Sequence, residues 1–175
     1  FVDPSQPLHW SGPIASNTLN QLFNTTDWGE LDYLILDMPP GTGDIHLTMV
    51  QDIPVDGVAI VSTPQEIALA DARKAFSMYN TDKIQVPILG LIENMSWFTP
   101  AELPQNKYYI FGKEGGKQLA NELGLVLLGQ IPLVQSICES ADQGKPITYT
   151  NEPDILTNSF VSLAENIIKR LKLIK

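Results

Sequence analysis

An apolar run that ends on a carboxylate and continues into prolines and glycines is the stretch with the clearest chemical meaning. Residues 31–44 read LDYLILDMPPGTGD, so Asp37 closes the run and Pro40, Gly41 and Gly43 follow it. A carboxylate here can bind Mg²⁺ through water, because Mg²⁺ takes oxygen ligands and keeps much of its hydration shell. The prolines restrict the backbone, and the glycines let N–H groups approach an anion. The stretch predicts a magnesium and phosphate site; a solvated strand end closed by a Pro-Gly turn is the alternative.

The elements that would position this stretch can be read from the hydrophobic pattern. Four runs are continuous in Val, Ile and Leu, which is typical of parallel strands covered on both faces. They lie at 31–37, 57–63, 86–94 and 125–132. Helical spacing and helix-end signals between and around them predict helices over 13–26, 64–80, 114–124 and 153–173, with another beginning near Asp44.

Strands that alternate with helices predict an α/β fold: a doubly wound, mostly parallel sheet with helices on both faces. The sequence shows no internal repeat, and residues 97–109 form a loop-like insertion. Ligands of such sheets bind beyond the carboxyl ends of the strands, and Asp37 falls at such an end. The helix expected near Asp44 adds its N-terminus to the same region. Together these features predict a Walker-B-type aspartate with a phosphate-sensing switch loop.

Composition excludes several other classes of function. The net charge of the 175 residues is −9, and four of the eleven basic residues lie in the last seven positions, so no basic stripe is available for nucleic acid. No apolar run approaches the roughly 20 residues that cross a bilayer. Cys138 is the only cysteine, which excludes a disulfide framework and a thiolate-rich metal site built by one chain. A cytoplasmic location is the simplest expectation.

The string WGELDYLILDMPPGTGDIHLTMVQ, residues 28–51, closely resembles the Mrp/ApbC branch of the MinD–ParA-like P-loop ATPases, which act as iron–sulfur cluster carriers. Further matches follow in order: WSGPIASNTLNQL (10–22), VSTPQEIALADARKA (61–75), ENMSWF (93–98), IFGKEGGKQLA (110–120), LGQIPL (128–133) and ADQGKPI (141–147). The resemblance spans nearly the whole chain.

The resemblance implies roles for individual residues. Asp37 corresponds to the catalytic acid that holds the water network of Mg²⁺, and Gly41 to the switch glycine that senses the γ-phosphate. Pro40, beside it, belongs to the same nucleotide-binding loop. Asn94 corresponds to the asparagine that recognises adenine, and Pro132 to the loop against the base. ATP and Mg²⁺ are the cofactors expected. From its position alone, Asn94 would instead be a strand-end residue that caps a turn.

One further match concerns assembly. Asp71, in ADARKA, corresponds to an acid near the nucleotide-dependent dimer contact of the family, so the full-length protein is expected to form a homodimer. On its own, Asp71 reads as an exposed helical residue.

The phosphate cradle of the family is missing from the sequence. Relatives carry a deviant Walker A loop, KGGxGKS, after the first strand, and no such string occurs here. The nearest candidate, FGKEGGKQ at 111–118, has Phe111 where the first glycine belongs and Gln118 where the hydroxyl residue belongs. We therefore expect residues 1–175 to be the C-terminal part of a single ATPase domain, with the first strand and P-loop upstream of Phe1. The 175 residues alone should not hydrolyse ATP.

The cluster ligands of the family are missing as well. Many relatives place a CPxC pair just after the NMS segment, and two subunits bridge a [4Fe–4S] cluster; here that position reads WFTPAELPQNKYYIFG. No iron–sulfur ligand is predicted. Cys138 is expected on a helix as a small buried apolar residue, and His9 and His46 as ordinary surface or packing residues.

Two functions from different classes follow. The first is a Mg-ATP-dependent switch of the Mrp type that serves iron–sulfur cluster assembly or transfer to apoproteins. The alternative is a MinD/ParA-like regulatory ATPase that binds a protein partner or a membrane without a cluster. The basic tail IIKRLKLIK (167–175) superficially fits a membrane helix, but Ile167 and Leu171 continue the packing face of the preceding helix, so membrane binding is not expected.

Overall fold

The computed structural model describes residues 12–82, 84, 86–100, 102–149 and 155–174. The chain divides into two compact units, Phe1–Val55 and Asp56–Lys175, and each is considered by itself. Six α-helices, one 3₁₀ turn and three strands occur among the described residues: α1 (Gly12–Thr25), α2 (Asp44–Asp52), β1 (Val58–Ser62), α3 (Glu66–Tyr79), β2 (Ile88–Glu93), α4 (Gly115–Leu123), β3 (Leu127–Gln130), α5 (Gln135–Asp142), η1 (Ile147–Tyr149) and α6 (Ile155–Ile174). The predicted helices, including the one near Asp44, are all present.

The first unit contains α1 and α2, which contact each other. Two polar pairs link them: the Ser16 hydroxyl donates to Thr48 Oγ1 at 3.2 Å, and Asn20 Nδ2 donates to Asp52 Oδ2 at 2.6 Å. These bonds join the middle and the end of α2 to α1, so α1 supports the helix that follows the glycine loop.

The predicted strand over 31–37 is wrong. This segment has no regular secondary structure, and most of its apolar side chains are exposed, with Ile35 at 89%. A continuous apolar run shows what a segment can bury, but a strand also needs a neighbour to complete its backbone hydrogen bonds. None of the three strands in the described part of the chain pairs with 31–37.

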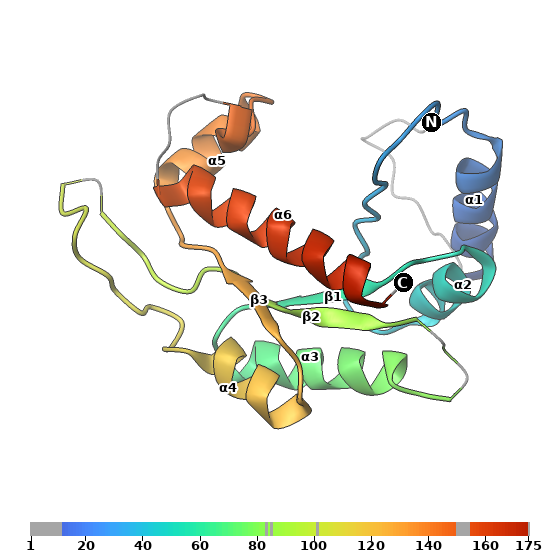
Figure 1. Ribbon diagram of the computed structural model, residues 1–175, viewed down its shortest axis with the longest axis horizontal. Coiled ribbons are helices and arrows are strands. Elements are labelled where there is room, and N and C mark those ends of the chain that lie inside the picture. The colour runs from blue at the N-terminus through green and yellow to red at the C-terminus, as the bar shows by residue number, and fades with distance from the viewer. Residues whose placement is uncertain (1–11, 83, 85, 101, 150–154, 175) are drawn as a thin grey trace. The chain divides into compact units, whose positions relative to one another are not determined.

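The second unit is built on a parallel sheet of order β1-β2-β3, which confirms the other three predicted strands and the α/β fold. Helix α6 covers one face of this sheet, while α3 and α4 cover the other (Figure 1). The sheet is therefore the middle layer of three, as continuous apolar strands require.

Each face of the sheet has its own core. On the side of α3 and α4 the buried residues are Ile60, Leu69, Ala72, Leu91, Leu119 and Ala120. On the side of α6, the buried residues Leu89, Ile92, Leu128 and Ile131 pack against Phe160, Leu163, Ile167 and Leu171 of the helix. The helical spacing predicted for 153–173 is confirmed as a packing face, and the tail up to Leu171 is part of it.

One of the basic residues of the tail, Arg170, forms a hydrogen bond at a bulge in the central strand. Val58 pairs with Ile88 and Ala59 with Gly90, so Leu89 is an extra residue in β2. The carbonyl of Leu89 accepts a hydrogen bond from Nε of Arg170 on α6 at 3.1 Å. Arg170 therefore satisfies a backbone group of the sheet, a role that its position near a helix end did not suggest.

The insertion at 97–109 is a loop held at its two ends. Phe98 and Tyr108 exchange two backbone hydrogen bonds of 2.7 and 2.9 Å, and Nζ of Lys107 lies 3.8 Å from the centroid of the Trp97 ring. Leu133 N–H donates to the carbonyl of Trp97 at 2.7 Å, which ties the loop to the segment after β3.

Candidate functional site

The segment proposed to bind magnesium and phosphate lies in the first unit. Asp37, Pro40 and Gly41 are exposed, and Gly41 has φ +103°, a conformation that side chains rarely adopt. Apart from Gly41 itself and its two neighbours in the chain, no heavy atom lies within 4 Å of the place where a Cβ on Gly41 would stand. Gly43 is the N-cap of α2, and no side chain caps this helix end. The open loop, its left-handed glycine and the uncapped helix are features that an anion-binding loop needs.

The residues proposed to hold the base lie in the second unit, at the carboxyl edge of the sheet. Asn94 directly follows β2, and its N–H donates to the carbonyl of Ser62 on β1 at 2.7 Å. Pro132 follows β3 and is buried. The structure thus brings the ends of neighbouring strands together at this edge, as their predicted roles require. The side chain of Asn94 accepts a hydrogen bond from Met95 N–H at 2.9 Å, a local contact with the residue that follows it.

Glu93 is a residue that sequence reasoning missed. It ends β2, it is completely buried, and both carboxylate oxygens accept hydrogen bonds. Gly116 N–H donates to Oε2 at 2.6 Å, and Gln130 Nε2 donates to Oε1 at 2.7 Å. The signal in the sequence was an acid at the end of an apolar run, the same pattern that drew attention to Asp37.

The glycine-rich segment 111–118 has an internal structural role. Its glycines begin α4, and the N–H of Gly116 is taken by the carboxylate of Glu93. A Cβ on Gly115 would lie 2.2 Å from the carbonyl oxygen of Pro64, and one on Gly116 would lie 2.9 Å from Glu93 Oε2. Glycine is needed here for close packing against the loop between β1 and α3 and against β2. The geometry supports the interpretation that this segment is not a phosphate-binding P-loop.

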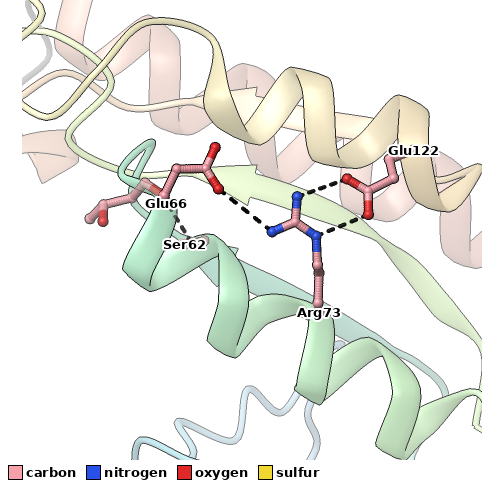
Figure 2. A network of polar contacts seen from close by, with 5 residues as sticks. Ser62, Glu66, Arg73 and Glu122 are labelled. Atoms are coloured by element: carbon pink, nitrogen blue, oxygen red, sulfur yellow. Dashed lines mark hydrogen bonds and ion pairs between the residues drawn. The ribbon is translucent and has the colours of Figure 1, made fainter.

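An ion-pair cluster joins α3 to the last turn of α4. Arg73 donates to Glu122 through Nε at 2.9 Å and Nη2 at 2.8 Å, and its Nη1 lies 3.8 Å from Glu66 Oε2 (Figure 2). The hydrogen bond to Arg73 lowers the pKa of Glu122, and the same bond raises the pKa of Arg73. Asp71, the residue matched to the dimer contact, is exposed on α3 and pairs with Lys74 at 2.9 Å.

Replacing Arg73 by leucine should lower the thermal unfolding midpoint at neutral pH, because it removes the two-point link between α3 and α4. Glu122 has a lowered pKa in the folded state, so the stability it contributes is present above its unfolded pKa and is lost as the pH falls through the folded one. The difference between the two proteins should therefore shrink in that acidic window.

Thermal unfolding followed by circular dichroism across this pH range checks the prediction. Lys74→Leu is the matched control, since Lys74 pairs with Asp71 on its own helix and links no second element. A pH-independent difference for Arg73→Leu would show that lost packing, rather than the pair with Glu122, causes the change.

The expectation for Cys138 is wrong in one respect. It lies on α5 as predicted, but it is exposed, and its Sγ lies 3.7 Å from Asp142 Oδ2. Helix α5 has no buried residue, so its helical spacing places Cys138 on the solvent side. His46 is buried on α2, in accord with a packing residue, and His9 lies outside the described residues. Across the described ranges, no three His, Cys, Asp or Glu side chains cluster so that they could hold a metal ion.

A cavity of about 640 Å³ opens at the other end of the second unit. It is lined by the last residues of α3 and α4, including Tyr79 and Leu123, and by Ile88 at the start of β2. Burial raises the pKa of the Tyr79 hydroxyl. None of the proposed site residues lines this cavity, which lies at the amino ends of the strands, away from the edge where such sheets bind ligands.

Comparison with known proteins identifies the family. Residues 1–168 match the ParA family described as NUBPL iron-transfer P-loop NTPase. The chain is 44% identical over 172 residues to the Arabidopsis thaliana "iron-sulfur protein required for NADH dehydrogenase, mitochondrial", covering 98% of this chain and 54% of the relative. It is 42% identical to the mouse "iron-sulfur cluster transfer protein NUBPL", covering 98% and 53%, and 40% identical to the Synechocystis "iron-sulfur cluster carrier protein", covering 99% and 48%.

Two solved structures extend the comparison. A nucleotide-binding protein of Archaeoglobus fulgidus in complex with ADP, with Co found, matches with a TM-score of 0.68 at 34% identity over 81% of this chain and 56% of that one. The cell division ATPase MinD of Pyrococcus furiosus matches with a TM-score of 0.61 at 21% identity over 91% and 59%, which supports the fold alone.

These matches confirm the resemblance read from residues 28–51 and from the motifs that follow them. The chain spans about half the length of the curated relatives. None of the helices in the described part of the chain has the length and apolar character of a membrane span. The chain therefore belongs to the Mrp/NUBPL family of iron–sulfur cluster carrier P-loop NTPases, whose fold is ParA/MinD-like.

Proposed function

We propose that the protein containing this chain is a Mg-ATP-dependent conformational switch that acts in iron–sulfur cluster assembly or transfer to apoproteins. The observation that carries the proposal is the loop after Asp37, in which Gly41 stands at φ +103° before the uncapped start of α2. Family membership supports the cluster part, since the relatives are named as cluster carrier or transfer proteins.

The residues of the chain have separate tasks in this proposal. Asp37 orients the water shell of the metal, and Pro40 and Gly41 carry a backbone that approaches the γ-phosphate. Asn94 and Pro132 hold the adenine base at the edge of the sheet. Bound Mg-ATP supplies the triphosphate whose cleavage changes the state of the loop.

We propose further that the phosphate cradle is supplied by polypeptide outside these 175 residues, as part of the same ATPase domain. The absence of a Walker A string supports this, and so does the bond between Gly116 and Glu93, which occupies the first turn of α4. The lengths of the relatives leave room for such a segment.

Turnover measurements test the proposal. The full-length protein should bind and slowly hydrolyse ATP in a Mg²⁺-dependent way, whereas residues 1–175 alone should show no turnover above background. The reason is that the chain lacks the Lys and the glycine-rich backbone that hold the β- and γ-phosphates. Equal turnover by both proteins would refute the proposed division. No binding of ATP by the full-length protein would refute the switch itself.

The alternative, a MinD/ParA-like regulatory ATPase without a cluster, is favoured by one observation: the chain has a single cysteine. Two copies offer two thiolates, where a [4Fe–4S] cluster bridged in the family's manner takes four. Anaerobic reconstitution with iron and sulfide separates the two functions, because only the carrier binds both elements and passes them to an apo iron–sulfur protein.

The packing of α6 against the sheet argues against its use as a membrane helix. A homodimer and a cytoplasmic location stay predictions; the Arabidopsis relative is named as mitochondrial.

A further inference from the structure

Glu93 is the most deeply buried ionisable residue that the proposed function leaves without a role. Its side chain is 0% exposed, and none of the ion pairs formed by the described residues includes it. Burying a carboxylate without compensation is strongly unfavourable, so its hydrogen bonds must offset that cost. It has two on the side chain, from Gly116 and Gln130.

The contacts of Glu93 converge on the edge that presents the base-binding residues. Its carbonyl oxygen accepts from Ile131 N–H at 2.9 Å, one residue before Pro132. The same carbonyl accepts from the Ser96 hydroxyl at 2.9 Å, and Ser96 N–H donates to the carbonyl of Ile131 at 2.9 Å. Asn94 is the next residue along the chain. Glu93 thus lies between the two residues proposed to hold adenine.

The side chain ties this edge to a third element. The carboxylate joins the first turn of α4, through Gly116, to the last residue of β3, through Gln130. The negative charge also suits the N-terminal end of a helix. A single buried group therefore links β2, β3 and α4 near the point where the Asn94 and Pro132 segments leave the sheet.

We propose that Glu93 is a positioning residue that sets base specificity by holding the Asn94 and Pro132 segments at a fixed separation. The inference rests on the proposed function, which assigns adenine recognition to those two residues. Glu93 has no contact with the nucleotide in this proposal, because it is completely buried and both carboxylate oxygens are hydrogen-bonded inside the protein.

The test compares binding of fluorescent ATP and GTP analogues, and of inorganic tripolyphosphate as a competitor, by the full-length protein. Glu93→Leu removes both acceptor oxygens and places an apolar side chain at this buried position. It should lower the ratio of ATP to GTP affinity about tenfold, while the affinity for tripolyphosphate is unchanged, since only base recognition depends on this edge. General destabilisation would weaken the binding of all three ligands alike.

Glu93→Gln should keep most of the preference for ATP. Its amide oxygen can accept from Gly116, and its NH₂ can donate to the Gln130 carbonyl once that amide is reversed. Rescue by glutamine would show that the hydrogen bonds to Gly116 and Gln130, and not the negative charge, maintain the preference for ATP. Glu139→Gln is the matched control, because Glu139 accepts a 2.6 Å hydrogen bond from Gln135 on an exposed helix surface. The ratio of ATP to GTP affinity of this variant should equal that of the wild type.

The outcomes separate the two proposals. A folded Glu93→Leu protein with the wild-type ratio overturns the role of Glu93 and leaves the proposed function intact. Wild-type protein that binds ATP and GTP equally overturns adenine recognition at this edge, and the role of Glu93 with it. If Glu93→Leu does not fold, Gln130→Met removes one donor only. A severalfold fall of the ratio then supports the inference, and an unchanged ratio overturns it.

Discussion

Replacement of Gly115 by alanine is expected to lower the free energy of unfolding by about 3 kcal/mol, the upper part of the range for overpacking a close contact. The added Cβ would lie 2.2 Å from the carbonyl oxygen of Pro64 and 2.9 Å from Leu69 Cδ1. Helix propensity alone predicts the opposite sign, since alanine is favoured over glycine by about 1 kcal/mol in a helix. The steric effect wins, because the contact is with backbone and α4 cannot move away freely.

In addition to the pair between Arg73 and Glu122, two contacts on its buried side hold α4 in place. The N–H of Gly116 is bonded to the buried carboxylate of Glu93, and Leu119 and Ala120 of the same helix are each 1% exposed within the core. A shift of α4 large enough to accept the new methyl group would break the first contact and open the second. The clash therefore cannot be relieved without the loss of one of these contacts.

Urea unfolding of residues 1–175 measures this effect. Gln118→Ala is the matched control, because position 118 is exposed on the same helix and the substitution should change stability by less than about 0.5 kcal/mol. A Gly115→Ala protein as stable as the wild type would show that α4 can separate from Pro64, and the packing role of the glycine-rich segment would have to be abandoned.

The second unit was largely predictable because its elements bury one another. Apolar runs at 57–63, 86–94 and 125–132 became the three strands, and the spacing of apolar residues in α6 matched its contact with the sheet. Each of these segments packs against another element of the same unit. The secondary structure that the local apolar pattern favours is then the one that the tertiary contacts stabilise.

The segment 31–37 shows where such reasoning fails. Its apolar pattern equals that of the three strands, yet it is irregular and Ile35 is 89% exposed. The apolar pattern of a segment indicates which faces it would bury as a strand, but it does not indicate which other strand would pair with the segment. The pairing partner has to be present before the pattern becomes structure.

Glu93 and Asp37 show the same limit at the level of single residues. Both are acids at the end of an apolar run, but Asp37 is exposed and Glu93 is completely buried. What separates them is contact with residues distant in the sequence: Glu93 binds Gly116 and Gln130, 23 and 37 positions away. No local pattern encodes those pairs. Cys138 is a similar case, since it is exposed on α5 while its neighbour Ile137 packs against the core.

Replacement of Asp37 by asparagine should lower the rate of Mg-ATP hydrolysis by the full-length protein about a hundredfold, a typical cost of removing one electrostatic group from a transition state. Asparagine keeps the size of the side chain and removes the negative charge that would hold the water shell of the metal. The concentration of Mg²⁺ needed for half-maximal rate should rise as well. That second shift identifies the metal, rather than the folding of the loop, as the point of action.

The control for this substitution is Asp32→Asn, which removes the same charge from an exposed aspartate in the same irregular segment. Its turnover and Mg²⁺ dependence should equal those of the wild type. Because both carboxylates are exposed, neither change should alter the unfolding midpoint by much, so a loss of turnover at Asp37 alone reports chemistry and not stability. Equal losses in the two variants, or none in either, would mean that the carboxylate before the glycine loop does not face a metal-bound phosphate.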